Sequence, residues 1–230
     1  MDAVRFTLRD DIALLTLDDG KANALSPDLL NAIHGALDRA EKEAAAVALV
    51  GRPGRFCAGF DLKVMRGGPE AARELVTLGG QTFLRFLEYP LPIVVGCTGH
   101  ALAAGAIALL VADYRVGARG AFQIGLNETA IGMTLPAYGT EFARERLSKR
   151  HFDRAVIQAE LYDPDGALDA GYLDRLELPE AVEGVALEEA GRLATLPKAS
   201  FRNNKRRAHA EVVARVRDGL VEDVRSLLSP

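Results

Sequence analysis

Short continuous runs of apolar residues alternate along the chain with segments in which apolar residues recur every three or four positions. Residues 12–17, 47–50 and 93–95 form the runs, which predict buried strands, and residues 114–116, Tyr-Arg-Val, predict a fourth strand. The periodic segments between them predict helices. Strands that alternate with helices favour right-handed crossover connections and a largely parallel sheet covered on both faces, an α/β fold.

The first helix has a clear start signal, because Ser26 followed by Pro27 supplies an N-cap and a proline at the first helical position. After about residue 141 the strand signals fade, which predicts a helical C-terminal part. Helices are predicted over residues 27–43, 69–87, 103–112, after 136, and over 152–160, 167–170, 182–194 and 201–228.

One stretch is long enough to be confused with a membrane span. Residues 94–112 contain only Thr98 and His100 as polar residues. Three glycines interrupt the stretch and β-branched residues begin it, so it predicts a buried strand, a glycine turn and a buried helix rather than a membrane helix.

Composition excludes several classes of function. The chain has 230 residues, of which 49% are hydrophobic and 26% charged, with a net charge of −4, so a single globular unit is expected and nucleic acid is not the default partner. Lys205, Arg206 and Arg207 are expected to form a solvated helix face. With only two cysteines and no signal-peptide pattern at the N-terminus, the expected compartment is a reducing cytoplasm.

Motifs for common cofactors are missing. No G-x-G-x-x-G opens a helix, no Walker loop occurs, and the four histidines show no metal-ligand spacing, so neither nicotinamide, nucleoside triphosphate nor metal chemistry is supported. Cys97 and His100 could form a thiol and its base, but both fall in an apolar segment, which favours a buried structural thiol.

Two glycine-bearing loops each join a predicted strand to a predicted helix, at residues 54–63 and 99–105. Small residues let a backbone approach a ligand closely. If both loops face one cleft, two free backbone N–H groups could meet at one carbonyl oxygen and form an oxyanion hole. Taken singly, each loop favours a mere tight turn, whereas the two loops together favour the oxyanion hole.

A single carboxylate, Glu128, stands in the otherwise neutral and largely apolar segment 124–133. A surface glutamate is the routine alternative. Burial among apolar side chains would disfavour its charged form and suit it to general acid–base chemistry.

At these three segments the sequence resembles the crotonase, or enoyl-CoA hydratase/isomerase, superfamily, from about residue 4 to residue 228. Residues 57–62, Cys-Ala-Gly-Phe-Asp-Leu, fit the family's first oxyanion loop, and the resemblance implies Phe60 and Ala104 as the N–H donors and Glu128 as the catalytic acid–base. The family has glycine where Ala104 stands. The resemblance also implies a coenzyme A thioester substrate, bound by residues of three short segments: Lys21 and Ala22; Ala58, Gly59, Asp61, Leu62 and Lys63; and Asn127.

The string at 124–129 looks closest to the mitochondrial-type Δ3,Δ2-enoyl-CoA isomerases, which manage with one glutamate. Hydratases of the family carry a second glutamate, at the position that Ile107 occupies here. Moving a proton between two carbons needs one base, whereas adding water needs groups for both the water and the proton. Isomerisation is therefore favoured, with hydratase or other crotonase chemistry, or a non-catalytic acyl-CoA-binding or scaffold protein, as alternatives.

The resemblance further implies a crotonase-type β-β-α superhelix. Residues 1–140 would form the spiral core with the acyl-CoA site, and residues 141–230 a helical C-terminal region of the same fold unit that assembles trimers. The expected partners are an acyl-CoA and identical subunits, as a homotrimer or a dimer of trimers, with no nucleic acid, membrane or metal and no cofactor other than the coenzyme A of the substrate.

Overall fold

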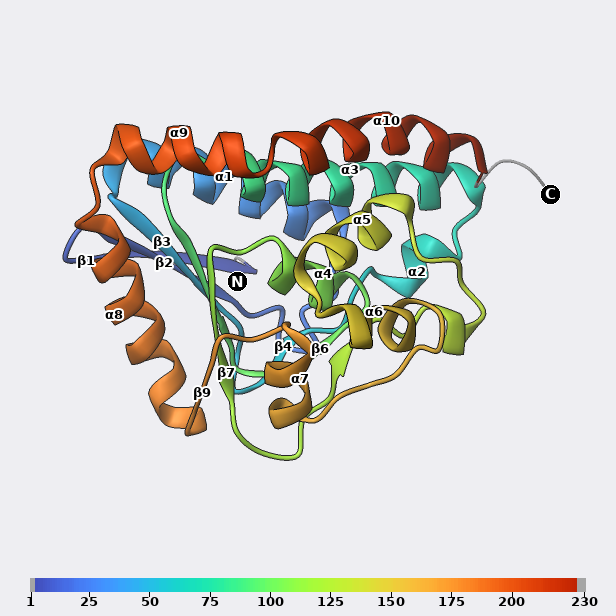
Figure 1. Ribbon diagram of the computed structural model, residues 1–230, viewed down its shortest axis with the longest axis horizontal. Helices are drawn as coiled ribbons and strands as arrows, with labels where there is room; N and C mark the ends of the chain where they lie inside the picture. Colours follow the sequence, from blue (N-terminus) through green and yellow to red (C-terminus); the bar gives the residue numbers. More distant parts are fainter. Residues whose placement is uncertain (1–2, 227–230) are drawn as a thin grey trace.

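Two sheets organise the chain in the computed structural model, which describes residues 3–226 (Figure 1). The larger sheet contains β1 (Val4–Arg9), β2 (Ile12–Leu17), β3 (Ala46–Val50), β5 (Ile93–Cys97), β7 (Tyr114–Ala118) and β9 (Arg175–Glu177), in that order. The smaller sheet contains β4 (Gly54–Cys57), β6 (Gly99–Leu102) and β8 (Ile124–Gly125). The strands within each sheet pair in parallel except β1 and β2, which are antiparallel.

The chain visits the two sheets in turn. Successive strands β3 and β4, β5 and β6, and β7 and β8 each give one strand to the larger and one to the smaller sheet before helical structure follows. The helices are α1 (Pro27–Glu43), α2 (Leu62–Met65), α3 (Pro69–Glu88), α4 (Ala104–Leu110), α5 (Ala137–Arg146), α6 (Lys149–Val156), α7 (Pro164–Ala170), α8 (Val182–Ala194), α9 (Lys198–Ala208) and α10 (Ala210–Ser226), with short 3-10 helices η1 (Thr129–Ile131) and η2 (Pro179–Ala181).

Both faces of the larger sheet are buried, which explains its continuous apolar runs. Leu14 and Val94 point to one face and pack with Ala186 of α8. Leu15 and Val95 point to the other face and belong to the main core, together with residues of α1, α3 and α4. In Figure 1, α8 lies against the strands at the left, while α1, α3, α9 and α10 run along the top. The expectation of a parallel, doubly covered sheet is confirmed.

Several strands escaped the sequence-based prediction. The segments at 54–57 and 99–102 were expected as loops but form β4 and β6, because each pairs with a neighbour that lies far away in the sequence. β1 is an edge strand of which only Val4 is buried, and β9 has three residues of which only Leu176 is buried. The prediction that no strand follows residue 141 was therefore wrong.

The C-terminal helix predicted over 201–228 is two helices. His209, which ends α9, departs from helical geometry with φ −99° and ψ 5°, and α10 begins at the next residue. Leu227 and Leu228 lie outside the described residues. The expectation of a solvated face holds for Arg206 and Arg207 but is wrong for Lys205, which is buried and whose Nζ contacts Asp113 Oδ2 at 2.6 Å.

Cys97 is a buried thiol, as expected, and Cys57 is buried as well. Cys57 and Cys97 are free, and burial raises the pKa of each thiol to about 12, so neither is a thiolate at neutral pH. The stretch at 94–112 is divided among β5, β6 and α4. Among residues 3–226, no helix combines the length and apolar character that a membrane crossing requires.

Candidate active site

The parallel pairing of the smaller sheet brings the three predicted segments to one edge. Because β4, β6 and β8 run in the same direction, the residues that follow them leave the sheet at the same end. Gly105 at the start of α4 packs directly on this edge: a Cβ there would lie 2.3 Å from the Cys57 carbonyl oxygen. Only glycine allows α4 to approach β4 so closely.

The two glycine-bearing loops touch at Gly59. A Cβ built at Gly59 would lie 2.8 Å from the Ala103 Cβ and 3.4 Å from the Ala104 nitrogen. Two hydrogen bonds fix the first loop, from Leu25 N to Gly59 O at 2.8 Å and from Asp61 N to Leu25 O at 3.0 Å.

The N–H groups of Phe60 and Ala104 are left without an acceptor within residues 3–226. Ala104 begins α4, so its N–H has no partner inside the helix. Two free donors thus come from loops in contact, which is the arrangement that an oxyanion hole requires.

A cavity of about 410 Å³ opens in front of these loops. Fourteen residues line it: Ala58, Phe60, Leu62, Met65, Val76, Ala103, Asn127, Glu128, Ile131, Gly132, Met133, Thr134, Leu135 and Pro136. Most of these side chains are apolar, and two of the three polar ones, Asn127 and Glu128, come from the segment 124–133. An elongated apolar ligand with one polar end suits such a lining.

Glu128 is the acidic side chain of this lining. The residue is 7% exposed, and its Oε2 is buried without a hydrogen-bond partner in the described part of the chain. Burial raises the pKa of Glu128 to about 7. The Glu128 carbonyl accepts hydrogen bonds from Ile131 N at 3.1 Å and Met133 N at 2.9 Å, which hold the residue at the start of η1. A carboxyl group with this pKa can both take and return a proton near neutral pH.

The other predicted substrate-binding residues lie around the cavity rather than in its lining. Asp61 caps α2, because its Oδ1 accepts a hydrogen bond from Lys63 N at 2.8 Å. Lys63 and Lys21 are exposed. Ala22 is tied to the first loop, since its carbonyl accepts a hydrogen bond from Ala58 N at 3.0 Å.

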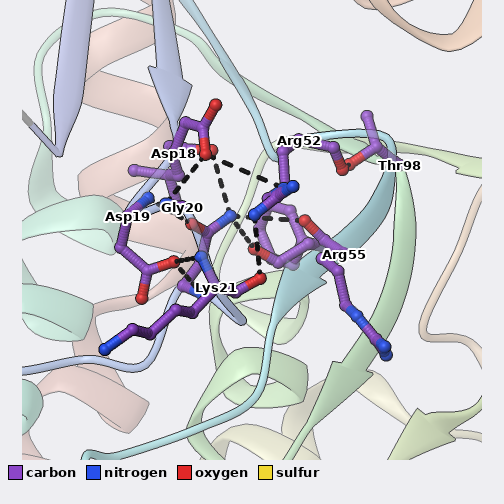
Figure 2. A network of polar contacts seen from close by, with 10 residues as sticks. Asp18, Asp19, Gly20, Lys21, Arg52, Arg55 and Thr98 are labelled. Carbon is purple, nitrogen blue, oxygen red and sulfur yellow. Dashed lines mark hydrogen bonds and ion pairs between the residues drawn. The ribbon is translucent and has the colours of Figure 1, made fainter.

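The turn that carries Lys21 and Ala22 is held rigidly by a polar network (Figure 2). Asp19 Oδ1 accepts hydrogen bonds from Lys21 N at 2.7 Å and Asn23 N at 2.9 Å. Asn23 is fully buried, and its Nδ2 donates to the Phe56 carbonyl at 3.1 Å. Arg52 donates to the Lys21 carbonyl at 3.2 Å. In Figure 2 the Lys21 side chain extends away from this network, so its ammonium group is available to a ligand.

Part of the lining was not predicted. Val76 comes from α3 and Met65 from α2, and residues 134–136 extend the lining beyond the segment 124–133. The sequence does carry a signal for this part of the lining, because Met133 and Leu135 are apolar residues between Gly132 and Pro136, where a solvent-exposed loop would be polar.

The chain belongs to the enoyl-CoA hydratase/isomerase family, whose sequence pattern matches residues 7–228. The α/β fold with its alternating sheets is accordingly the crotonase fold, and the protein is a crotonase-family enzyme that processes enoyl-CoA thioesters.

The named relatives include both enoyl-CoA isomerases and enoyl-CoA hydratases. Human mitochondrial enoyl-CoA delta isomerase 1 is 27% identical over 95% of this chain and 75% of its own length. A probable enoyl-CoA hydratase of Rhodobacter capsulatus is 30% identical over 90% of this chain and 81% of its own. The crystal structure of an enoyl-CoA hydratase/isomerase family protein from Pseudomonas syringae is 44% identical, with a TM-score of 0.96 over 98% of both chains. The human mitochondrial delta3-delta2-enoyl-CoA isomerase is 26% identical, with a TM-score of 0.92 over 98% of this chain and 90% of that one.

Proposed function

We propose that this enzyme is a Δ3,Δ2-enoyl-CoA isomerase, which moves the double bond of a 3-enoyl-CoA into conjugation with the thioester. The observation that carries the proposal is Glu128, a buried carboxylate whose Oε2 has no hydrogen-bond partner among the described residues, in the same cavity as Phe60 and Ala103. A scaffold protein would not need this carboxylate, and a salt-bridged Glu128 on the surface would have favoured that alternative.

The proposed reaction is a proton shift through a dienolate. Glu128 removes a proton from C2, and the electron pair of that C–H bond forms a double bond between C1 and C2 while the π pair of the thioester carbonyl moves onto its oxygen. The negative charge spreads onto the thioester oxygen, where the N–H groups of Phe60 and Ala104 stabilise it. The protonated Glu128 then delivers its proton to C4. As the carbonyl re-forms, the C1–C2 electron pair becomes the C2–C3 double bond, and the C3–C4 π pair forms the new C–H bond. Since no oxidation occurs and no water is added, the step needs no metal or redox cofactor.

The surroundings of the missing second glutamate support isomerisation over hydration. Ile107 is fully buried, and its Cδ1 would lie 3.1 Å from a Cβ added at Gly139 of α5. It therefore lies in the apolar packing between α4 and α5. Glu141, a nearby candidate for holding a water, instead pairs with Arg144 and Arg215.

The substrate's coenzyme A is proposed to run along Lys21, Ala22 and the loop from Ala58 to Lys63. Ala22 and Ala58 are hydrogen-bonded to each other beside the cavity, and the two lysines are exposed cations that suit phosphate groups. We also propose a homotrimeric assembly through the C-terminal region, where the large apolar side chains of Ile157 and Leu178 are 61% and 58% exposed. Sedimentation equilibrium tests the assembly.

The deciding experiment uses the purified, unmutated protein. It measures the conversion of 3-enoyl-CoA to 2-enoyl-CoA by ultraviolet absorbance, and water uptake by 2-enoyl-CoA by mass. Faster double-bond migration supports the isomerase. Water uptake that is faster by a wide margin would assign the hydratase reaction, and acyl-CoA binding without either conversion would assign a non-catalytic role.

A further inference from the structure

Ala103, at the junction of the second loop and α4, has a backbone conformation that favours glycine. Its φ is 51° and its ψ is −125°. Among residues 3–226, the other non-glycine residues with positive φ are Asp10, Asp11, Asn23 and Ala159. Aspartate and asparagine tolerate this region comparatively well, whereas alanine has no side-chain hydrogen bond to offset the strain. Backbone strain of this kind is typical of functional sites, where the surrounding structure holds the strained residue in place.

A hydrogen bond to β8 and the close approach of Gly59 restrict the position of the Ala103 methyl group. The Ala103 N–H donates to the Gly125 carbonyl at 3.0 Å, which ties the residue to β8. Its Cβ faces Gly59, where an added Cβ would approach it to 2.8 Å. The residue lines the cavity together with Phe60 and Glu128. An alanine side chain has no rotamer to change, so a ligand cannot push this methyl aside without moving backbone.

The position of this methyl matters because Ala103 is bonded directly to the nitrogen of Ala104, a proposed oxyanion donor. A thioester oxygen bound by both donors lies about 3 Å from each nitrogen. The carbon next to the thioester carbonyl is two bonds from that oxygen, so its substituents must fit against the wall beside the donors. One hydrogen on this carbon faces the base, and the second substituent must be accommodated by the wall.

We infer that the Ala103 methyl is a specificity-determining group that restricts the enzyme to acyl thioesters unbranched at the carbon next to the carbonyl. The inference rests on the proposed oxyanion geometry and adds a substrate class to the proposed function. A methyl branch at that carbon would compete with the Ala103 methyl for the same space. A pocket discriminates one such carbon by roughly 10- to 200-fold.

The test compares 3-hexenoyl-CoA with 2-methyl-3-hexenoyl-CoA, which still carries one removable proton at C2. The ratio of kcat/KM values for the two thioesters is measured for the unmutated protein, for Ala103→Gly and for Ala159→Gly. Ala159 is the matched control, because it is also an alanine with positive φ, at 53°, but lies outside the cavity lining. Circular dichroism confirms that each variant is folded.

We expect the unmutated protein and Ala159→Gly to prefer the unbranched thioester by roughly 10- to 200-fold. Ala103→Gly should lower this preference by about ten-fold or more, because it removes the competing methyl. Equal turnover of the two thioesters by the unmutated protein, or an unchanged ratio in Ala103→Gly, would overturn the inference.

A binding measurement separates this inference from the proposed reaction. Hexanoyl-CoA and 2-methylhexanoyl-CoA cannot isomerise, so their affinities, measured by calorimetry, report only on the cavity. Tighter binding of the unbranched thioester, with a smaller difference in Ala103→Gly, supports the steric role even if isomerase activity is absent. Equal affinity for both in the unmutated protein overturns it.

Discussion

Glu128 and Asp113 are both largely buried carboxylates, but the regions around them treat the negative charge in opposite ways. Asp113 Oδ2 accepts hydrogen bonds from Lys205 Nζ at 2.6 Å and from Ile93 N at 2.8 Å, so its charge is matched. Glu128 has a buried Oε2 with no partner within residues 3–226, and burial raises its pKa to about 7.

The difference in hydrogen-bond partners distinguishes a carboxylate with a structural role from one that can act as an acid or base. The buried pair ties elements together, because Asp113, just before β7, contacts both Lys205 of α9 and Ile93 at the start of β5. When a buried carboxylate without a partner is ionised, it lowers the stability of the folded state. A carboxylate that is kept despite this loss of stability is typical of a functional site. Changes in the cavity should therefore alter rates, and changes at the Asp113–Lys205 pair should alter stability.

The largest expected effect on activity follows from changing Glu128, the carboxylate in the cavity. Glu128→Gln keeps the shape but removes the base, so isomerase kcat should fall by roughly 10²- to 10⁴-fold while the affinity for a saturated acyl-CoA stays similar. Steady-state kinetics and calorimetry measure the two. Glu141→Gln, which alters an ion-paired glutamate outside the cavity lining, is the control and should retain activity. An equally active Glu128→Gln would remove Glu128 from the mechanism.

The matching change at the other carboxylate should act on folding. Asp113→Asn leaves the Lys205 charge buried without its partner, which should lower the free energy of unfolding by about 3–5 kcal/mol. Urea denaturation measures the loss, and kcat of the folded variant should be close to normal. Arg206→Ala, on the same helix but exposed, should change stability by no more than about 0.5 kcal/mol. A stable but inactive Asp113→Asn would break the comparison.

The oxyanion hole is tested by removing one donor. Ala104→Pro deletes the N–H at the first position of α4, where proline is otherwise tolerated, so turnover should fall by about 100-fold in a folded protein. Lys149→Pro makes the same change at the first position of α6, away from the cavity lining, and should leave turnover unaffected. Unchanged turnover in a folded Ala104→Pro would refute the assignment of this donor.

The pH dependence sharpens the contrast further. The active form of the base is ionised, so with a pKa of about 7 the isomerase kcat should rise about ten-fold between pH 6 and pH 8.

The same pKa shift affects stability. The folded state binds the Glu128 proton more tightly than the unfolded state, in which the pKa is near 4.5. The free energy of unfolding should therefore fall as pH rises from about 4.5 to about 7. Glu128→Gln should lose that part of the fall, as denaturation at pH 5 and pH 8 would reveal. Identical pH profiles for both proteins would contradict the raised pKa.

The smallest expected effect concerns the edge of the cavity. Lys21→Glu and Lys63→Glu reverse exposed charges, so each should raise KM for an acyl-CoA by up to about five-fold at low salt, and less at high salt. Lys42→Glu, an exposed change on α1, is the matched control. If neither lysine variant changes KM at low salt, the proposed path of the coenzyme A is wrong.

Local sequence predicted the elements whose burial pattern is strong. The strands that became β2, β3 and β5 are largely apolar on both faces. The start of α1 carries its own cap, in which Ser26 accepts a hydrogen bond from Leu29 N. β4, β6 and β8 are too short to show such a pattern. They form only by pairing with strands that are distant in the sequence, so local sequence does not reveal them. The burial of Lys205 escaped prediction for the same reason, since Asp113 is 92 residues away in the chain.

For the site, the sequence by itself determined which residue types were available: two loops of small residues, one carboxylate in an apolar segment, and an isoleucine where a second glutamate would stand. Only the tertiary structure decided that these segments lie at one sheet edge, that α3 and residues 131–136 complete the cavity, and that Ala103 adopts a strained conformation beside Gly59. The physical reason is that exposure, pKa and backbone strain depend on neighbours that are distant in the chain, whereas periodicity and capping depend on residues a few positions away.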